Sequence, residues 1–230
     1  SSNTLKSELE NTINKAMQVV TNQIENQYYF KTMEQERTIR LLIDWMEQEL
    51  RRNEFEVKHV EKNVVIVIKN LKLNLRIDRI DITPEGKNIL IDYKTGSINS
   101  NSWFKDQIQD PQLPIYALKS SPNAIAFAII SQDKLKWSSI CDPTIPNPFP
   151  PNSNVRIPNE IQVELGWPDW NNLLSFWENK LTGLAEEFTQ GQIQINPIKK
   201  NETCRNCGYS MLCRIAESAS NENNLGNLDG

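Results

Sequence analysis

The sequence of 230 residues predicts an α/β fold of three layers, in which a mixed central sheet is flanked by helices. Two observations lead to this class. Apolar residues recur at helical spacing near both ends of the chain, and apolar and polar residues alternate through much of the middle, as they do in strands. The apolar and charged fractions, 38% and 23%, are ordinary for a globular protein, and the length suits one domain with a sizeable core.

Two amphipathic helices are expected at the N-terminus, and residues 1–53 are assigned to this helical segment. The first helix spans roughly 20 residues, and its apolar stripe consists of Leu5, Leu9, Ile13, Met17, Val20 and Ile24. The second runs from about Glu34 to Arg52, and its stripe consists of Ile39, Leu42, Ile43, Met46 and Leu50. The main α/β core is then expected over residues 54–200.

A β-hairpin is predicted between Leu71 and Gly96. Odd-numbered apolar residues alternate with polar ones from Leu71 to Ile77, residues 84–86 (Pro-Glu-Gly) supply turn chemistry, and an apolar run resumes at 89–91. The apolar positions become even-numbered at Ile80, so the alternation changes phase at Asp78. Such a change requires a bulge or a strand that is buried on both faces. Residues 54–62 and 64–68 predict two further strands ahead of the hairpin.

The second half of the chain predicts further core elements. A helix is expected from about Pro111 to Ser120, a core strand at Ala124–Ser131, and its edge partner at Leu135–Ile140. The proline-rich stretch from Cys141 to Pro158 predicts an extended surface loop without regular structure. From Trp167 a helical stripe, expected to pack on the sheet and to end near Gly191, consists of Trp170, Leu173, Leu174, Trp177, Leu181, Leu184 and Phe188.

The hairpin also carries the candidate catalytic residues. Asp92 and Lys94 project from the same side of a strand because successive side chains alternate between faces. If the strands pair around the turn near residue 85, Asp78 faces roughly position 92. Two carboxylates so close need a cation between them, and Mg²⁺ is bound through carboxylate oxygens. The alternative is a solvated ion pair between Asp92 and Lys94.

The helix at 111–120 adds two polar residues. Gln112 and Tyr116 are four apart and share a helical face, where both could reach a phosphate or the carboxylates, although such a pair also occurs as surface decoration. Trp103 and Phe104, in the preceding loop, could stack on an unpaired base or pack in the core. His59, the only histidine, is expected to be a solvent-facing strand residue rather than a ligand.

Charge is unevenly distributed in a chain with a net charge of −4. Between Arg51 and Lys105 there are eleven Lys and Arg residues and seven acids, a local excess of four positive charges. This excess suits a groove that follows phosphates beside an acidic metal site, and a solvated strand surface would have the same composition.

The four cysteines are also unevenly spaced. Cys204, Cys207 and Cys213 lie within ten residues near the C-terminus, in the segment 201–217, and Cys141 stands alone. Thiolates at these spacings could face a zinc ion or a 4Fe-4S cluster, with Cys141 as a poor candidate for the fourth ligand; free thiols or a disulfide are the alternative.

The ends of the chain indicate its context. The sequence has no run of 18 apolar residues, and it begins Ser1-Ser2-Asn3, so we expect neither a membrane span nor a signal peptide, and we expect a cytoplasmic protein. Because it does not begin with Met, the chain is expected to be a fragment or a processed product. The Asn-rich segment 218–230 is expected to be disordered.

These motifs together resemble a known superfamily. The segments LRIDRID (75–81) and ILIDYKTG (89–96) resemble motifs II and III of the PD-(D/E)xK nucleases, and specifically the RecB/AddB-type nuclease domains of bacterial helicase-nucleases. Residues 110–116 resemble the Q-x-x-x-Y helix of that group, and the C-terminal cysteines resemble those of its AddB-like, iron-sulfur-bearing members. The resemblance covers about Ile39 to Ala216 and is greatest to chromosomally encoded DNA repair proteins.

The resemblance implies a restriction-endonuclease-like fold and a DNA nuclease, most often an exonuclease. Asp78, Asp92 and the backbone carbonyl of Tyr93 would bind Mg²⁺ or Mn²⁺, and Lys94 would orient or deprotonate the attacking water. Gln112 and Tyr116 would complete the site, and the products would carry 5'-phosphate and 3'-hydroxyl ends. The resemblance also implies a helicase domain or subunit as a partner. The chain has no G-x-x-x-x-G-K-[ST] loop, so any ATP-driven unwinding is expected to belong elsewhere.

Two departures from the pattern leave rivals open. No counterpart of the motif I histidine is present, and Leu75 stands where relatives usually have Gly. An inactive nuclease-like module that binds DNA or a helicase partner therefore remains an alternative. A resolvase or restriction enzyme, with selective cutting, is the other. In AddB-like proteins the fourth cysteine ligand lies far upstream of the nuclease core, outside this sequence.

Overall fold

The architecture was analysed in a computed structural model, which describes residues 2–21, 28–96, 98, 100–105, 107–151, 153–156, 169–192, 195–197, 200–205 and 207–213. Within this part of the chain a mixed sheet has the strand order β1-β2-β3-β4-β5-β6. The β3–β4 and β5–β6 pairs are parallel and the other pairs are antiparallel. The strands are β1 Glu56–Ile68, β2 Leu71–Ile82, β3 Asn88–Lys94, β4 Ala124–Ser131, β5 Lys134–Cys141 and β6 Asn154–Arg156.

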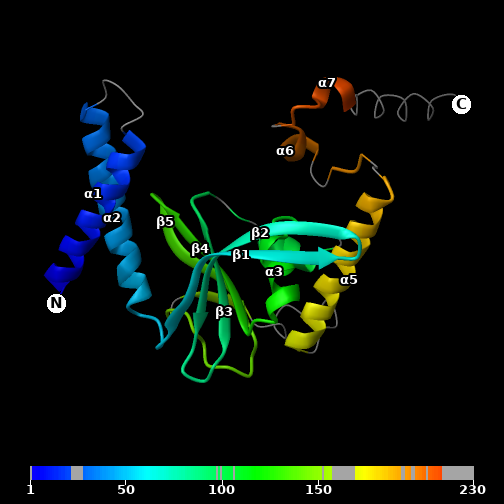
Figure 1. The fold of residues 1–230 in the computed structure, drawn as a ribbon, viewed down its shortest axis with the longest axis horizontal. Helices are drawn as coiled ribbons and strands as arrows, with labels where there is room; N and C mark the ends of the chain where they lie inside the picture. The colour runs from blue at the N-terminus through cyan, green and yellow to red at the C-terminus, as the bar shows by residue number, and fades with distance from the viewer. Residues whose placement is uncertain are drawn as a thin grey trace, which may run out of the picture.

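Helices cover both faces of the sheet, which gives the three expected layers (Figure 1). One layer is the N-terminal helical hairpin, formed by α1 (Ser2–Thr21) and α2 (Tyr28–Glu49). The opposite layer consists of α3 (Gln112–Ser120) and α5 (Trp170–Thr189). A 3₁₀ helix, η1 (Ser100–Phe104), precedes α3, and the short helices α6 (Lys200–Arg205) and α7 (Ser210–Cys213) follow α5. The fold is the mixed α/β fold that the sequence predicts.

One apolar core lies between the sheet and each helical layer, because β3 and β4 are apolar on both faces. Leu90 and Ile125 lie under α3 and α5 together with Trp177, whereas Ile91 and Ala126 lie on the other face with Trp45 of α2. All of these side chains are buried. Both faces of the central strands are therefore covered, as continuous apolar runs in parallel strands require.

The hairpin between β2 and β3 is confirmed, with the predicted register. Arg79 pairs with Ile91 and Ile82 pairs with Asn88, so the turn is centred on residue 85. Gly86 closes the turn with a φ of +78°, and its N–H donates to the carbonyl of Thr83 at 2.9 Å. A positive φ of this kind is the conformation that favours glycine.

The change of phase in β2 is also present. Ile77 and Ile80 both belong to the core beneath α3 and α5, although an unbroken strand would direct them to opposite faces. Asp78 lies between them, and Glu61, at the corresponding place in β1, has a φ of +49°. The ladder of β1 and β2 shifts register between Val57 and His59. Asp78 and Ile80 share a face as residues two apart in a strand do, and the irregular ladder brings Ile77 to that layer as well.

Three expectations for the outer elements were wrong. The strands predicted at 54–62 and 64–68 are one strand, β1, because β1 pairs with β2 along its length and tolerates exposed polar residues in its middle. Strand β5 is not the edge of the sheet, since β6 pairs beside it. The proline-rich stretch is no simple surface loop, because it contributes β6 and buries Ile145 and Phe149 in the core below α2. Proline blocks only its own N–H, so an extended segment can still pack.

The helix α5 follows its predicted stripe for part of its length. Trp170, Leu173, Trp177 and Leu181 are buried against the sheet, whereas Phe188 is 68% exposed in the last turn of the helix. The residues before Asp169 that opened the predicted stripe, Trp167 among them, lie outside the described residues, and so does the tail from Ser218. No helix in the described ranges is long and apolar enough to cross a membrane.

Candidate active site

Strand β3 carries Asp92 and Lys94 on the face that is covered by α3. Asp92 follows the buried run Ile89-Leu90-Ile91 and is 1% exposed, because its side chain lies on a covered face of an inner strand. The Lys94 side chain is 29% exposed, and its Nζ lies 2.8 Å from Asp92 Oδ2. The solvated surface pair that the sequence left open is therefore excluded, since the carboxylate is inside the protein.

Asp78 meets this pair from the neighbouring strand. The backbone N–H of Tyr93 donates to Asp78 Oδ2 at 2.9 Å. Asp78 is half-buried, and its charge contributes to the electrostatic environment of Asp92. The structure thus brings both predicted carboxylates and the lysine to one place on adjacent strands.

Helix α3 completes a chain of contacts around the lysine. Lys94 Nζ donates to Gln112 Oε1 at 3.1 Å, and Gln112 Nε2 donates to the hydroxyl of Tyr116 at 3.0 Å. The Tyr116 hydroxyl donates to the backbone carbonyl of Arg76, two residues before Asp78. The i, i+4 pair of α3 therefore connects the strand that carries Lys94 with the strand that carries Asp78.

Burial makes the negative charge of Asp92 costly, and the positive charge of Lys94 offsets that cost only in part. Burial raises the pKa of Asp92, the contact with Lys94 lowers it, and the charges of Asp78 and Asp110 raise it, with a net increase. Asp92 Oδ2 is bonded to Lys94 Nζ, whereas Oδ1 is buried and accepts no hydrogen bond from the described residues. A buried carboxylate oxygen without such a bond is costly, and a divalent cation would remove that cost. The residues fit a Mg²⁺ or Mn²⁺ site.

The site opens to solvent through a groove. Asp78, Gln112 and Tyr116 line an open groove of about 540 Å³, together with Asn74 and Arg76 of β2. Burial raises the pKa of Tyr116, its hydrogen bond from Gln112 opposes this, and the charges of Asp92 and Asp78 add to it. The charges of both carboxylates therefore act on the phenol of Tyr116. Of the five predicted side chains, three line the groove, and Lys94 is connected to it through its bond to Gln112.

Two features of the site were not anticipated from the sequence. Asp110 lines the same groove immediately before α3 and has a φ of +49°. In the sequence, Asp110 could have been recognised by its position directly before Pro111 and Gln112. The second feature is a set of buried charged residues on the opposite face of the sheet, which includes Arg79 and Asp81. Its signal in the sequence was the presence of an arginine and a second aspartate between the isoleucines at the end of β2.

Other candidates from the sequence lie away from this chemistry. Trp103 is fully buried and its Nε1 donates to the carbonyl of Asp110 at 3.0 Å, so it is a core residue and not a surface for stacking a base. Phe104 is buried as well. His59 is half-buried in β1, where it pairs with Ile80. These aromatic residues support the fold.

The cysteines do not form a metal centre in the described ranges. No group of three or more His, Cys, Asp or Glu side chains converges there in a way that could hold a metal ion. Cys204 belongs to α6 and Cys213 to α7, and Cys141 is buried in β5, where burial and the charge of Asp142 raise its thiol pKa to about 12. A raised pKa disfavours the thiolate that a metal needs. The structure therefore does not support the iron-sulfur cluster.

A mixed sheet that places two carboxylates and a lysine on adjacent strands defines a restriction-endonuclease-like domain. In agreement, the family model described as the PD-(D/E)XK nuclease superfamily matches residues 2–214, and the chain belongs to this superfamily. A search of curated proteins finds no match. Among solved structures, the one titled "Crystal structure of SSO0001" aligns over 88% of this chain and 94% of its own, with 17% identity and a TM-score of 0.38.

Proposed function

We propose that the chain is a Mg²⁺- or Mn²⁺-dependent DNA nuclease, acting as an exonuclease domain of a RecB/AddB-like DNA repair protein. Membership of the superfamily supports phosphodiester hydrolysis. The observation that carries the proposal is the buried Asp92 carboxylate, which pairs with Lys94 through Oδ2, lies within the electrostatic influence of Asp78, and has an Oδ1 that accepts no hydrogen bond from the described residues. DNA is then the substrate. The expected location is the cytoplasm, and the expected partner is a helicase domain or subunit.

Each residue has a separate task in this proposal. Asp78, Asp92 and the backbone carbonyl of Tyr93 would hold the metal, which when bound polarises the phosphodiester and lowers the pKa of water. Lys94 Nζ contacts both Asp92 and Gln112, and these contacts fix the position of the ammonium group. From there it would orient the attacking water and offset the charge that develops on the phosphate. Tyr116 holds Gln112 in turn.

The first experiment compares cleavage of linear single-stranded DNA with Mn²⁺ by the wild type, Lys94→Ala and Lys119→Ala. Loss of a preorganised charge of this kind costs about 10²- to 10³-fold in kcat, so Lys94→Ala should lose that much. Lys119→Ala removes an exposed lysine from the same helical layer and should retain wild-type cleavage. Equal rates for Lys94→Ala and the wild type would contradict the proposal.

A second candidate is an inactive nuclease-like module that binds DNA or a helicase partner. It is favoured by the small number of ligands, because no third His, Cys, Asp or Glu joins the two carboxylates within the described ranges. A crystal soaked in Mn²⁺ separates the two candidates. Anomalous density between Asp78 and Asp92 supports the nuclease, whereas its absence, together with no DNA cleavage by the wild type, supports the binding module.

A further inference from the structure

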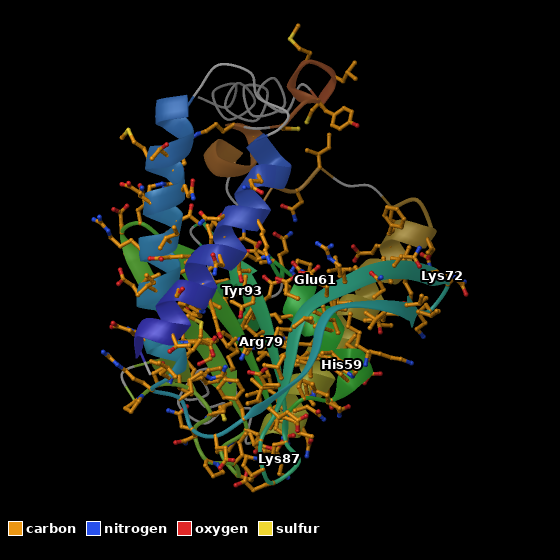
Figure 2. The ribbon with its side chains drawn as sticks, turned by 60° about the vertical axis from the view of Figure 1, so that its left-hand side comes forward. His59, Glu61, Lys72, Arg79, Lys87 and Tyr93 are labelled. Atoms are coloured by element: carbon orange, nitrogen blue, oxygen red, sulfur yellow. The ribbon has the colours of Figure 1, made fainter. Side chains whose placement is uncertain are left out.

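A group of five residues lies on the face of the sheet that is opposite the candidate site. We call it the back-face network, and it consists of Glu49, Arg52, Arg79, Asp81 and Tyr93. Glu49 ends α2, and Arg79 and Tyr93 are on the neighbouring strands β2 and β3 (Figure 2). Four of the members are charged, two of each sign. Buried charges are tolerated when they are paired in this way.

Arg79 is the centre of the network. Its Nε lies 2.6 Å from Asp81 Oδ1, its Nη1 lies 3.1 Å from Glu49 Oε1, and the same Nη1 donates to the Tyr93 hydroxyl at 2.9 Å. Burial disfavours the guanidinium charge, but the bond to Asp81 and the nearby negative charges outweigh this effect, so the pKa of Arg79 is raised. The side chain is 11% exposed and is held from three directions.

Arg52 binds both carboxylates of the network and also the backbone at Pro148. Its Nη2 lies 2.8 Å from Asp81 Oδ2, its Nη1 donates to Glu49 at 2.9 Å, and its Nε donates to the carbonyl of Pro148 at 3.1 Å. The Arg52 side chain is fully buried. Removing one charged member would take a partner from at least two buried charges, so the members depend on one another.

The network lies directly behind the proposed metal ligands. Arg79 follows Asp78 and Tyr93 follows Asp92, and successive residues of a strand point to opposite faces. The ladder between β2 and β3 ends at the pair of Arg79 and Ile91, so no further ladder pair joins the strands at Asp78 and Asp92. At that point Tyr93 makes the connection twice, since its N–H donates to Asp78 and its hydroxyl accepts from Arg79.

We propose that Arg79 and Tyr93 are positioning residues, which fix the separation of Asp78 and Asp92 from the far side of the sheet. The inference rests on the proposed function. Through Glu49, the same contacts make the separation depend on the end of helix α2. The N-terminal helical hairpin is then a part of the catalytic apparatus that touches neither substrate nor metal. Groups that orient metal ligands in this way commonly change metal affinity or activity by 10- to 100-fold when they are lost.

The test uses Tyr93→Phe, which removes only the hydroxyl that binds Arg79. Tyr93 is 37% exposed, so the variant should fold. Titration with Mn²⁺, followed by electron paramagnetic resonance, should show a dissociation constant about tenfold higher than in the wild type. The kcat for single-stranded DNA should fall by a similar factor while KM stays within about twofold, because DNA contacts are unchanged. Tyr209→Phe, an exposed tyrosine near the C-terminus, is the matched control and should behave as the wild type.

A second variant tests the link to α2. Glu49→Gln keeps the shape of the side chain, and it should weaken Mn²⁺ binding in the same direction as Tyr93→Phe. Wild-type Mn²⁺ affinity and kcat in Tyr93→Phe would overturn the role of Arg79 and Tyr93, and wild-type affinity in Glu49→Gln would overturn the link to the helix. If the wild type itself binds no Mn²⁺ and cleaves no DNA, the proposed function fails, and this inference fails with it.

Discussion

At the level of single residues, Asp92 has the environment that most needs explanation. It is 1% exposed, its pKa is raised by burial, and among the residues that the structure describes only Lys94 lies close enough to form an ion pair with it. A fold that buries a carboxylate in this way loses stability unless a cation offsets the cost. Stability and metal binding should therefore be linked at this position.

This linkage gives a prediction for Asp92→Asn. In the wild type, Mn²⁺ at about 100 times its dissociation constant should add about 2.7 kcal/mol to the free energy of unfolding, which corresponds to a rise of roughly 5–10 °C in Tm. In Asp92→Asn the rise should disappear, because an amide is a weak ligand. Differential scanning calorimetry with and without Mn²⁺ measures both. Asp133→Asn, at an exposed carboxylate between β4 and β5, should keep the full shift, and a full shift in Asp92→Asn would remove Asp92 from the metal site.

At the level of elements, the β2–β3 hairpin holds the site because its turn fixes the register. A slip by one residue would move Asp92 and Asp78 to opposite faces. Gly86 permits the turn through its φ of +78°, and an added Cβ would meet no atom within 4 Å. The need for glycine there is a matter of backbone conformation alone. Helix α5 contains Gly183, which is also free of neighbours but has ordinary helical geometry.

The two glycines should respond in opposite directions to the same substitution. Gly86→Ala should lower the free energy of unfolding by about 1 kcal/mol, because a side chain disfavours the left-handed conformation. Gly183→Ala should raise it by about 0.5–1 kcal/mol, because alanine restricts the unfolded chain and favours the helix. Urea denaturation of both variants tests this pair. A gain of stability in both variants would show that the turn imposes no constraint on Gly86, and a loss in both would contradict the prediction for Gly183.

At the level of the whole molecule, the two helical layers are joined through the sheet, and each layer supports the site from its own face. The α3 layer holds Lys94 through Gln112, and α2 contacts Arg79 through Glu49. Helix α5 supports α3 by filling the core behind it. Trp177 is fully buried there, and its Nε1 donates to the carbonyl of Trp103 at 2.9 Å.

The core below α5 should therefore be sensitive to truncation at its centre and not at its end. Trp177→Ala should lower the free energy of unfolding by about 3–5 kcal/mol, since it leaves a cavity and an unpaired carbonyl. Phe188→Ala, in the exposed last turn of the same helix, should stay within about 0.5 kcal/mol of the wild type. Equilibrium unfolding in urea gives both values. A large loss in Phe188→Ala would mean that the end of α5 is covered by another part of the protein.

Sequence reasoning was reliable where a local pattern is sufficient. The hairpin, its register, strand β4 and helix α3 were recovered within about one residue, because alternation, turn residues and helical spacing act over a few positions. It failed where a distant partner decides the outcome. Strand β1 stays continuous because β2 pairs with it, and the prolines after Cys141 pack because α2 leaves an apolar face to cover.

The same division applies to the site. The sequence by itself determined which residues are available, since Asp78, Asp92 and Lys94 are set by strand periodicity and a single turn. Only the tertiary structure decided that Asp92 is buried and that Lys94 donates to Gln112. It also decided that Arg79 donates to Tyr93 on the opposite face of the sheet. Burial and hydrogen bonding between segments depend on the packing of α2 and α3 on the sheet, which local patterns do not encode.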